Sequence, residues 1–122
     1  MDQPRLADWS PTMHHIDQNM QACIDTCLRC YQTCLGMSTG HCLEVGGEHA
    51  RPDHIKLMLA CSETCRATAH VMIIGSRHRK HLCAECADIC ADCASECERV
   101  RDMEECVQAC RACAESCRDM AA

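Results

Sequence analysis

Aromatic residues are almost absent from this 122-residue chain, which has no phenylalanine, one tyrosine (Tyr31) and one tryptophan (Trp9). A core built on aromatic packing is therefore excluded, and the aliphatic residues are few and scattered. Basic residues are outnumbered as well, since 12 lysines and arginines stand against 18 acidic residues, for a net charge of −6. Because binding to nucleic acid depends on positive charge, this balance argues against a nucleic-acid partner.

Long apolar runs are also missing. No stretch approaches the roughly 18 apolar residues that a membrane span requires, so we expect no membrane association. The first 20 residues lack the apolar core of a signal peptide, which predicts a cytoplasmic protein in a compartment where structural disulfides are rare. The length predicts one domain, residues 1–122. β-branched residues are sparse and never alternate, so no strand is expected.

Cysteine, in contrast, is abundant, and its spacing is regular. Alternating steps of three and four residues run through 23–34, 83–97 and 106–117, a further pair stands at 61 and 65, and one cysteine stands alone at 42. At about 100° per residue, such steps keep the first set within an arc of about 60° on one face of a helix. The candidate metal-binding cysteines are all sixteen: Cys23, Cys27, Cys30, Cys34, Cys42, Cys61, Cys65, Cys83, Cys86, Cys90, Cys93, Cys97, Cys106, Cys110, Cys113 and Cys117.

Boundary signals for the first two helices come from proline and glycine. Ser10 followed by Pro11 is typical of an N-cap with proline at the first helical position. Gly46–Gly47 would end that helix, Pro52 would open the second, and Gly75 would end it as the residue after the C-cap. We therefore expect helices at about residues 12–44 and 53–74.

The remaining two helices are predicted at about residues 77–99 and 103–120. Ser76 is a plausible N-cap for the third, and Asp102 with Glu105 three residues later resembles a capping box for the fourth. The links between the helices are short, which favours antiparallel neighbours. The expected fold class is therefore all-α, an antiparallel four-helix bundle with a cysteine-lined core.

The faces of the helices indicate which side is buried. The second helix has only two cysteines on its stripe and continues it with His54, Met58, Thr68 and Met72. The opposite faces of the third and fourth helices are polar and are interpreted as solvated; they carry Asp88, Asp92, Glu96, Glu104, Gln108, Arg111 and Glu115. The cysteine stripes must then face inward.

Several explanations of a thiol-lined core fail on spacing or number. Cysteine acting as a small hydrophobe explains one or two buried thiols, not fifteen on four stripes. Residues i and i+4 of a helix have Cβ atoms about 5–6 Å apart, whereas a disulfide needs about 3.5–4.5 Å, which disfavours bridges within a helix. Bridges between helices are possible in geometry, but the lack of a secretion signal opposes them. The ferredoxin spacing C-x2-C-x2-C-x3-C followed by proline is not present.

Metal storage fits the pattern better. Discrete zinc sites call for separate groups of four ligands, whereas these stripes are continuous. Thiolates select Cu(I), which accepts two or three sulfur ligands, and a bridging thiolate binds two ions. The pattern therefore predicts a container for many Cu(I) ions, with a thiol redox sensor or a zinc or mixed-metal buffer as alternatives.

The repeated C-x3-C-x2-C-x3-C pattern at residues 23–34 and 106–117, with the related run at 83–97, resembles the bacterial cysteine-rich four-helix-bundle copper storage proteins. The resemblance covers about residues 12–120 and is to the cytosolic branch of that family. It implies a bundle filled with Cu(I)–thiolate sites and commonly assembled as a tetramer. Copper ions would then be the partners, together with further copies of the chain.

The two ends of the expected bundle differ in their donor atoms. One end gathers Met37, His41, Cys42, His54, Met58 and Met103, and the other gathers Met13, Met20, Met72, Leu82 and Met120. The first is richer in histidine, and we interpret it as the copper entrance, with His41, His54 and Met58 as candidate ligands, because neutral ligands hold Cu(I) less tightly than thiolates. Cys42 lies off the stripe of its helix, and His49 gives no clear signal.

Two further expectations concern assembly and catalysis. A second apolar stripe on the first helix, formed by Ile24, Leu28, Tyr31 and Leu35, either flanks the interior or forms a subunit interface. The sequence contains no recognisable carboxylate pair, nucleophile–base set or phosphate-binding loop. We therefore expect a protein that is not an enzyme.

Overall fold

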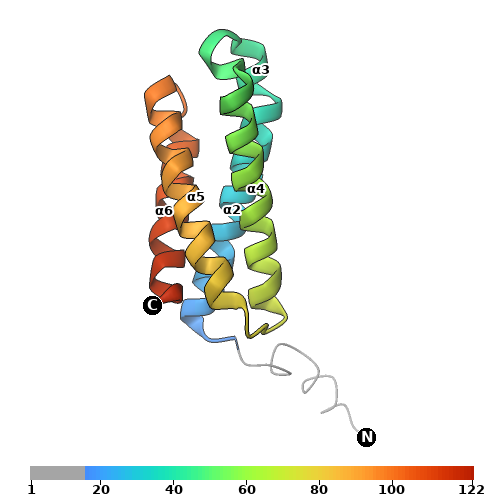
Figure 1. Cartoon of the computed structure of the whole chain (residues 1–122), viewed down its shortest axis with the longest axis vertical. Coiled ribbons are helices and arrows are strands. Elements are labelled where there is room, and N and C mark those ends of the chain that lie inside the picture. Colours follow the sequence, from blue (N-terminus) through green and yellow to red (C-terminus); the bar gives the residue numbers. More distant parts are fainter. Residues whose placement is uncertain (1–15) are drawn as a thin grey trace, which may run out of the picture.

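The computed structural model describes residues 16–122, which form four long helices: α2 (Gln18–Thr39), α4 (Pro52–Ile73), α5 (Arg79–Val100) and α6 (Glu104–Ala121). The short helix α3 (His41–Val45) and the 3-10 helix η2 (Gly47–Ala50) connect α2 to α4. Helices α2 and α5 each pack against both α4 and α6, which closes a ring of antiparallel neighbours (Figure 1). The predicted all-α four-helix bundle is confirmed, and no strand occurs between residues 16 and 122.

The two ends of the bundle are built differently (Figure 1). One end, called here the α3 end, holds α3, η2 and the turn between α5 and α6. The other, called the C-terminal end, holds the start of α2, the link between α4 and α5 and the C-terminus of α6. Each end therefore receives side chains from all four long helices.

The first helix differs from its predicted range of 12–44. The cap proposed at Ser10 and Pro11 lies outside the described residues. The described helix α2 follows Asp17, whose carboxylate accepts a hydrogen bond from the backbone N–H of Met20 at 2.8 Å. The prediction of an unbroken helix to residue 44 was wrong, because Gly40 adopts a non-helical φ of −116° and ψ of −89° and separates α2 from α3. Glycine is a poor helix former, so the helix breaks there at little cost.

The predicted boundaries of α4 agree with the structure to within one residue. Pro52 is its first residue, as expected. At its other end Gly75 has a φ of +69°, the N–H of Ser76 donates to the carbonyl of Val71 at 2.9 Å, and the N–H of Gly75 donates to Met72 at 3.1 Å. This pair of bonds is a Schellman motif, in which glycine supplies the left-handed residue.

Two predicted N-caps were wrong. Helix α5 starts after His78, and the Ser76 hydroxyl accepts a hydrogen bond from the His78 N–H at 3.0 Å within the link instead of capping the helix. At the start of α6, Met103 occupies the N-cap position and provides no side-chain cap. Arg101 and Asp102 both have positive φ, 73° and 56°, so this turn is a left-handed corner and the capping box does not form.

Sulfur fills the space between the helices. All sixteen cysteines have an exposed fraction of 0%, and the rest of the buried apolar residues are mainly alanine and methionine. Buried alanines such as Ala69, Ala87 and Ala109 flank the thiols. From residue 16 onward, none of the helices combines the length and apolar character needed to cross a lipid bilayer.

Candidate metal centre

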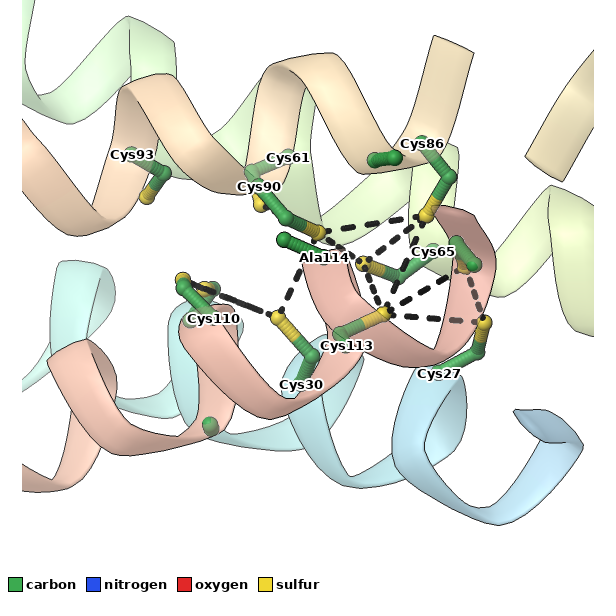
Figure 2. Close-up of a cluster of buried hydrophobic side chains, with 14 of the residues drawn as sticks. Cys27, Cys30, Cys61, Cys65, Cys86, Cys90, Cys93, Cys110, Cys113 and Ala114 are labelled. Atoms are coloured by element: carbon green, nitrogen blue, oxygen red, sulfur yellow. Dashed lines mark hydrogen bonds between the residues drawn. The ribbon is translucent and has the colours of Figure 1, made fainter. Parts of the chain in front are cut away.

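Fifteen of the sixteen cysteines, all except Cys42, form a continuous array that we call the sulfur column. Steps of three and four residues on α2, α5 and α6 present a new thiol to the interior at every turn. Helix α4 adds Cys61 and Cys65 near the middle. Figure 2 shows thiols from different helices, among them Cys27, Cys65 and Cys113, pointing toward one another in the shared space.

The thiols nearest the α3 end are in direct contact with those of the middle. The Sγ of Cys106 lies 3.6 Å from that of Cys97 and 3.5 Å from that of Cys34. Cys34 lies 3.6 Å from Cys110, which in turn lies 3.7 Å from Cys30. Helices α2, α5 and α6 therefore all contribute sulfur within a single stretch of the column.

From the middle the contacts continue toward the C-terminal end. The Sγ of Cys90 lies 3.5 Å from Cys65 and 4.0 Å from Cys30. Cys65 lies 3.9 Å from Cys113, and Cys113 lies 3.7 Å from Cys27. A near-linear S–Cu–S unit spans about 4–4.5 Å between sulfurs, so inserting Cu(I) requires these pairs to separate by roughly half an ångström.

Five groups of these thiols have all their sulfurs within 4.8 Å of one another. The groups are Cys34/Cys93/Cys106/Cys110, Cys30/Cys34/Cys61/Cys110, Cys30/Cys65/Cys90/Cys113, Cys27/Cys86/Cys113/Cys117 and Cys23/Cys83/Cys117. Successive groups share members, and all sixteen cysteines are free thiols. Overlapping groups of soft donors suit a chain of thiolate-bridged ions better than isolated four-ligand sites.

Protonation along the column is coupled, because one thiol donates its hydrogen bond to the next. Hydrogen bonds from Cys110 and then Cys34 lower the pKa of Cys106 to about 5, while Cys34 has a raised pKa because of Cys106. In the same way Cys117 and then Cys27 lower the pKa of Cys113 to about 6, while the pKa of Cys117 is raised. Neighbouring thiols thus have pKa values shifted in opposite directions, and a Cu(I) cation that replaces the shared proton of such a pair leaves the charge of the pair unchanged.

Cys42 has different neighbours, which with it form what we call the Cys42 cluster. Its Sγ lies 3.5 Å from Nε2 of His54, 3.8 Å from Sδ of Met58 and 3.7 Å from Sδ of Met103. All four side chains have exposed fractions of 1% or less. Burial is the main cause that raises the pKa of the Cys42 thiol, and the charges of Cys106 and Cys93 raise it further. The cluster is thus a compact set of one thiol, one imidazole and two thioethers.

Glu96 orients the imidazole of this cluster. Nδ1 of His54 lies 3.1 Å from Oε2 of Glu96, and since the carboxylate only accepts, Nδ1 carries the proton and Nε2 presents its lone pair to Cys42. Arg99, and then His54, hold the pKa of Glu96 below its ordinary value. A carboxylate behind the distal nitrogen is the usual support of a metal-binding histidine. The interpretation of Glu96 as a solvated residue was therefore wrong, and its side chain is only 21% exposed.

The other histidines of the α3 end lie beside the cluster. The His49 ring is buried, its Nε2 donates to the carbonyl of Arg101 at 2.9 Å, and its centroid lies 6.4 Å from that of His54. His41 packs edge-on against His49 at 5.4 Å, and among the described residues its buried Nε2 has no hydrogen-bond partner. The structure thus places His41 two rings away from Cys42, with His49 between them.

A sequence profile described as "Copper storage protein" matches residues 16–122. The chain belongs to the copper storage protein family. It is 37% identical over 74 residues to the uncharacterized cysteine-rich protein YhjQ of Bacillus subtilis strain 168, covering 61% of this chain and 68% of that protein.

Solved structures of similar sequence share the bundle. The Nmul_A1745 protein of Nitrosospira multiformis superimposes with a TM-score of 0.85 at 54% identity, over 87% of this chain and 97% of that one. Cu(I)-bound copper storage protein BsCsp3 gives 0.79 at 38% identity, over 86% and 100%. Apo-Csp3 from Bacillus subtilis gives 0.70 at 37% identity, over 84% and 98%. For this member of the family, multiple Cu(I) ions are therefore the cargo that the buried cysteine groups fit.

The cysteine spacing predicts the column but not every contact at its ends. Met103 belongs to the histidine-rich end and is not among the candidate ligands, yet its sulfur lies 3.7 Å from that of Cys42. Glu96 and His49 gave no signal because their partners, His54 and Arg101, are more than 40 residues away in sequence. Helical spacing places Met72 on the buried stripe of α4, as the structure confirms, but Met72 is not among the candidate ligands.

Proposed function

We propose that this chain stores many Cu(I) ions in the cytoplasm, bound by thiolates inside the bundle. The sulfur column supports this proposal, because each of its thiols lies within 4.8 Å of another thiol and the groups overlap along the bundle. Soft thiolates favour Cu(I), and the structural similarity to Cu(I)-bound BsCsp3 points to the same cargo. A reducing compartment would keep all the thiols free, which is why we place the protein in the cytoplasm.

Storage also explains why all sixteen thiols are buried. The thiols are fully buried and linked to one another, so bound ions would be shielded from water and from substrates. A catalytic metal site keeps an open coordination position, whereas this column offers an excess of ligands. We therefore assign the chain a role in holding copper without turnover.

Titration of the reduced apo-protein with Cu(I) against a competing chelator tests this function. We expect saturation on the order of one copper per cysteine, because each bridging thiolate is shared between ions. Saturation at one or two equivalents would contradict storage. A parallel titration with Zn²⁺ tests the alternative of a zinc buffer, which predicts tighter binding of zinc at a few four-thiolate sites.

We propose that copper enters at the α3 end, through the Cys42 cluster. The rings of His41, His49 and His54 form a row that leads from a partly exposed position to a buried thiol. Imidazole and thioether are neutral donors and release Cu(I) more readily than thiolates, so they suit exchange. Cys42 would then be the first thiolate that an incoming ion meets.

Replacing His41, His54 and Met58 together with alanine tests the entrance. Copper uptake and removal by a chelator should slow, and capacity should fall by only a few ions, because all the cysteines remain. The changes in rate are measured by mixing apo-protein with Cu(I) and holo-protein with chelator. Loading and unloading at the wild-type rate would move the entrance to the C-terminal end.

We further propose that the chain forms a homo-oligomer, as the family resemblance implies a tetramer. Ile24 of the second apolar stripe is buried, but Leu28 and Leu35 of α2 remain 38% and 37% exposed, and Leu59 of the adjacent α4 is 39% exposed. Covering these side chains with a second copy would remove apolar surface from water. Light scattering on the wild type and on L28E/L35E should show an assembly that the charged variant breaks; a monomeric wild type would refute it.

A further inference from the structure

The C-terminal end of the sulfur column carries a donor that the cysteine pattern does not include. Helix α4 has no cysteine beyond Cys65 toward its C-terminus, and the next positions of its buried stripe are Thr68 and Met72. Met72 has an exposed fraction of 0%. Its Sδ accepts a hydrogen bond from the thiol of Cys83 at 3.8 Å, so a lone pair of the thioether is directed into the column.

The thiol that Met72 contacts belongs to the last sulfur group of the column. Cys23 of α2, Cys83 of α5 and Cys117 of α6 lie with their sulfurs within 4.8 Å of one another, and all are fully buried. This is the one group of three rather than four thiols among those formed by the described residues. The remaining long helix, α4, provides Met72, whose sulfur lies beside Cys83 as a fourth donor.

We propose that Met72 is a Cu(I) ligand and completes a site of three thiolates and one thioether at the C-terminal end. This inference rests on the proposed storage of copper. Methionine sulfur is a soft donor that suits Cu(I), and a leucine would fill the same space without directing a lone pair at Cys83. On the same helix Met58 contacts Cys42 at 3.8 Å, so α4 places a thioether against a thiol at both ends of the bundle.

Because a thioether carries no charge, Met72 makes this site bind copper less tightly than a site of thiolates alone. An ion held by three thiolates and Met72 gains less electrostatic stabilisation than an ion among four thiolates in the middle of the column. Copper at this end should therefore be lost to a chelator before copper in the middle of the column. The C-terminal end becomes a second position from which the store exchanges ions.

Methyl NMR of protein labelled with 13C in the methionine methyl groups tests the ligand directly. Cu(I) is diamagnetic, so the apo and copper-saturated spectra are both readable. The Met72 signal, identified by its loss in M72L, should shift on saturation with copper as strongly as those of Met58 and Met103. Met120, at the same end but only partly buried, is the control and should shift much less. Leucine has a similar volume, so M72L should fold.

A second measurement reports the bond itself. In selenomethionine protein carrying M58L and M103L, X-ray absorption at the selenium edge should still show copper at bonding distance, and adding M72L should abolish it. A full copper load with a Met72 signal that moves no more than that of Met120, or a selenium spectrum without copper, would overturn the inference and leave storage intact. Failure to load copper at all would instead overturn the proposed function.

Discussion

Two pairs of cysteines test whether the column shares its copper ions. Cys90 and Cys110 lie in the middle and between them belong to three of the four groups of four sulfurs. Cys42 and Cys97 belong to none of these groups, although they are just as fully buried. The double variants C90A/C110A and C42A/C97A therefore remove the same number of thiols from positions of equal burial.

The expected loss of copper differs between the two variants. Cys90 lies 3.5–4.0 Å from Cys65, Cys61, Cys86 and Cys30, so its thiolate can bridge ions to several neighbours. If each central sulfur bridges two ions, C90A/C110A should lose about four ions, whereas C42A/C97A should lose about two. The apo-proteins should be destabilised equally, by about 1 kcal/mol for each buried sulfur removed.

Chelator-competed titration of both variants measures the capacities, and thermal unfolding of the apo-proteins measures their stabilities. Matched unfolding temperatures with unequal capacities would show that position in the column, and not the number of thiols or the loss of packing, determines how much copper is held. Equal capacities would refute the sharing of ions between neighbouring thiolates. The cysteines would then act as independent ligands.

Three further predictions follow from the packing and the charges. The reduced apo-protein should be helical by far-UV circular dichroism without copper; a coil spectrum that becomes helical only on loading would contradict this. E96Q should weaken copper binding at the Cys42 cluster about 10-fold or more, because His54 loses the carboxylate that orients it, and should leave the total copper capacity unchanged. The control E63Q, a change on the exposed face of α4, should have no effect in the same chelator competition. Burial raises the pKa of Cys42 in the folded protein. Its neutral thiol therefore contributes fully to the stability of the apo-protein below the unfolded-chain pKa of about 8.5, and this contribution is lost as the pH rises through the higher pKa of the folded state. The wild type should therefore lose more stability than C42A between about pH 8 and pH 10, and parallel unfolding curves would argue against a buried neutral thiol there.

The column was predictable from the sequence because its cause is local. A residue three or four places along a helix returns to the same face, so the stripes through Cys23 and Cys106 indicated an inward direction without knowledge of any partner helix. The antiparallel order of the helices was also predictable from local features, because short links join helices that run in opposite directions. The glycine and proline boundaries at Pro52 and Gly75 were readable because backbone geometry at these residues is restricted or unusually free.

The ends of the bundle were not predictable in the same way, because their contacts join distant segments. Glu96 looks like any other polar residue on the outer face of α5 until α4 places His54 against it. Arg101 and Asp102 both have positive φ, but neither is a glycine, so the sequence gives no sign of this turn. The carbonyl of Arg101 in the same turn accepts the hydrogen bond from His49. Ligands on regular helices could thus be found from spacing, and the residues that orient them could not.

The interruption at Gly40 has a rotational consequence for the last thiol. In an unbroken helix, eight residues separate Cys42 from Cys34 by about 80° around the axis, which would turn the Cys42 thiol toward the flank of the bundle. The break lets α3 begin again with its own phase, and Cys42 then points to His54 with no exposed surface. A Cβ at residue 40 would lie 3.0 Å from the carbonyl oxygen of Gly36, so a larger residue is crowded in this conformation. The break at Gly40 thus changes the direction in which Cys42 points. Without it, the thiol would lie off the cysteine stripe of its helix; with it, the thiol faces the imidazole of His54.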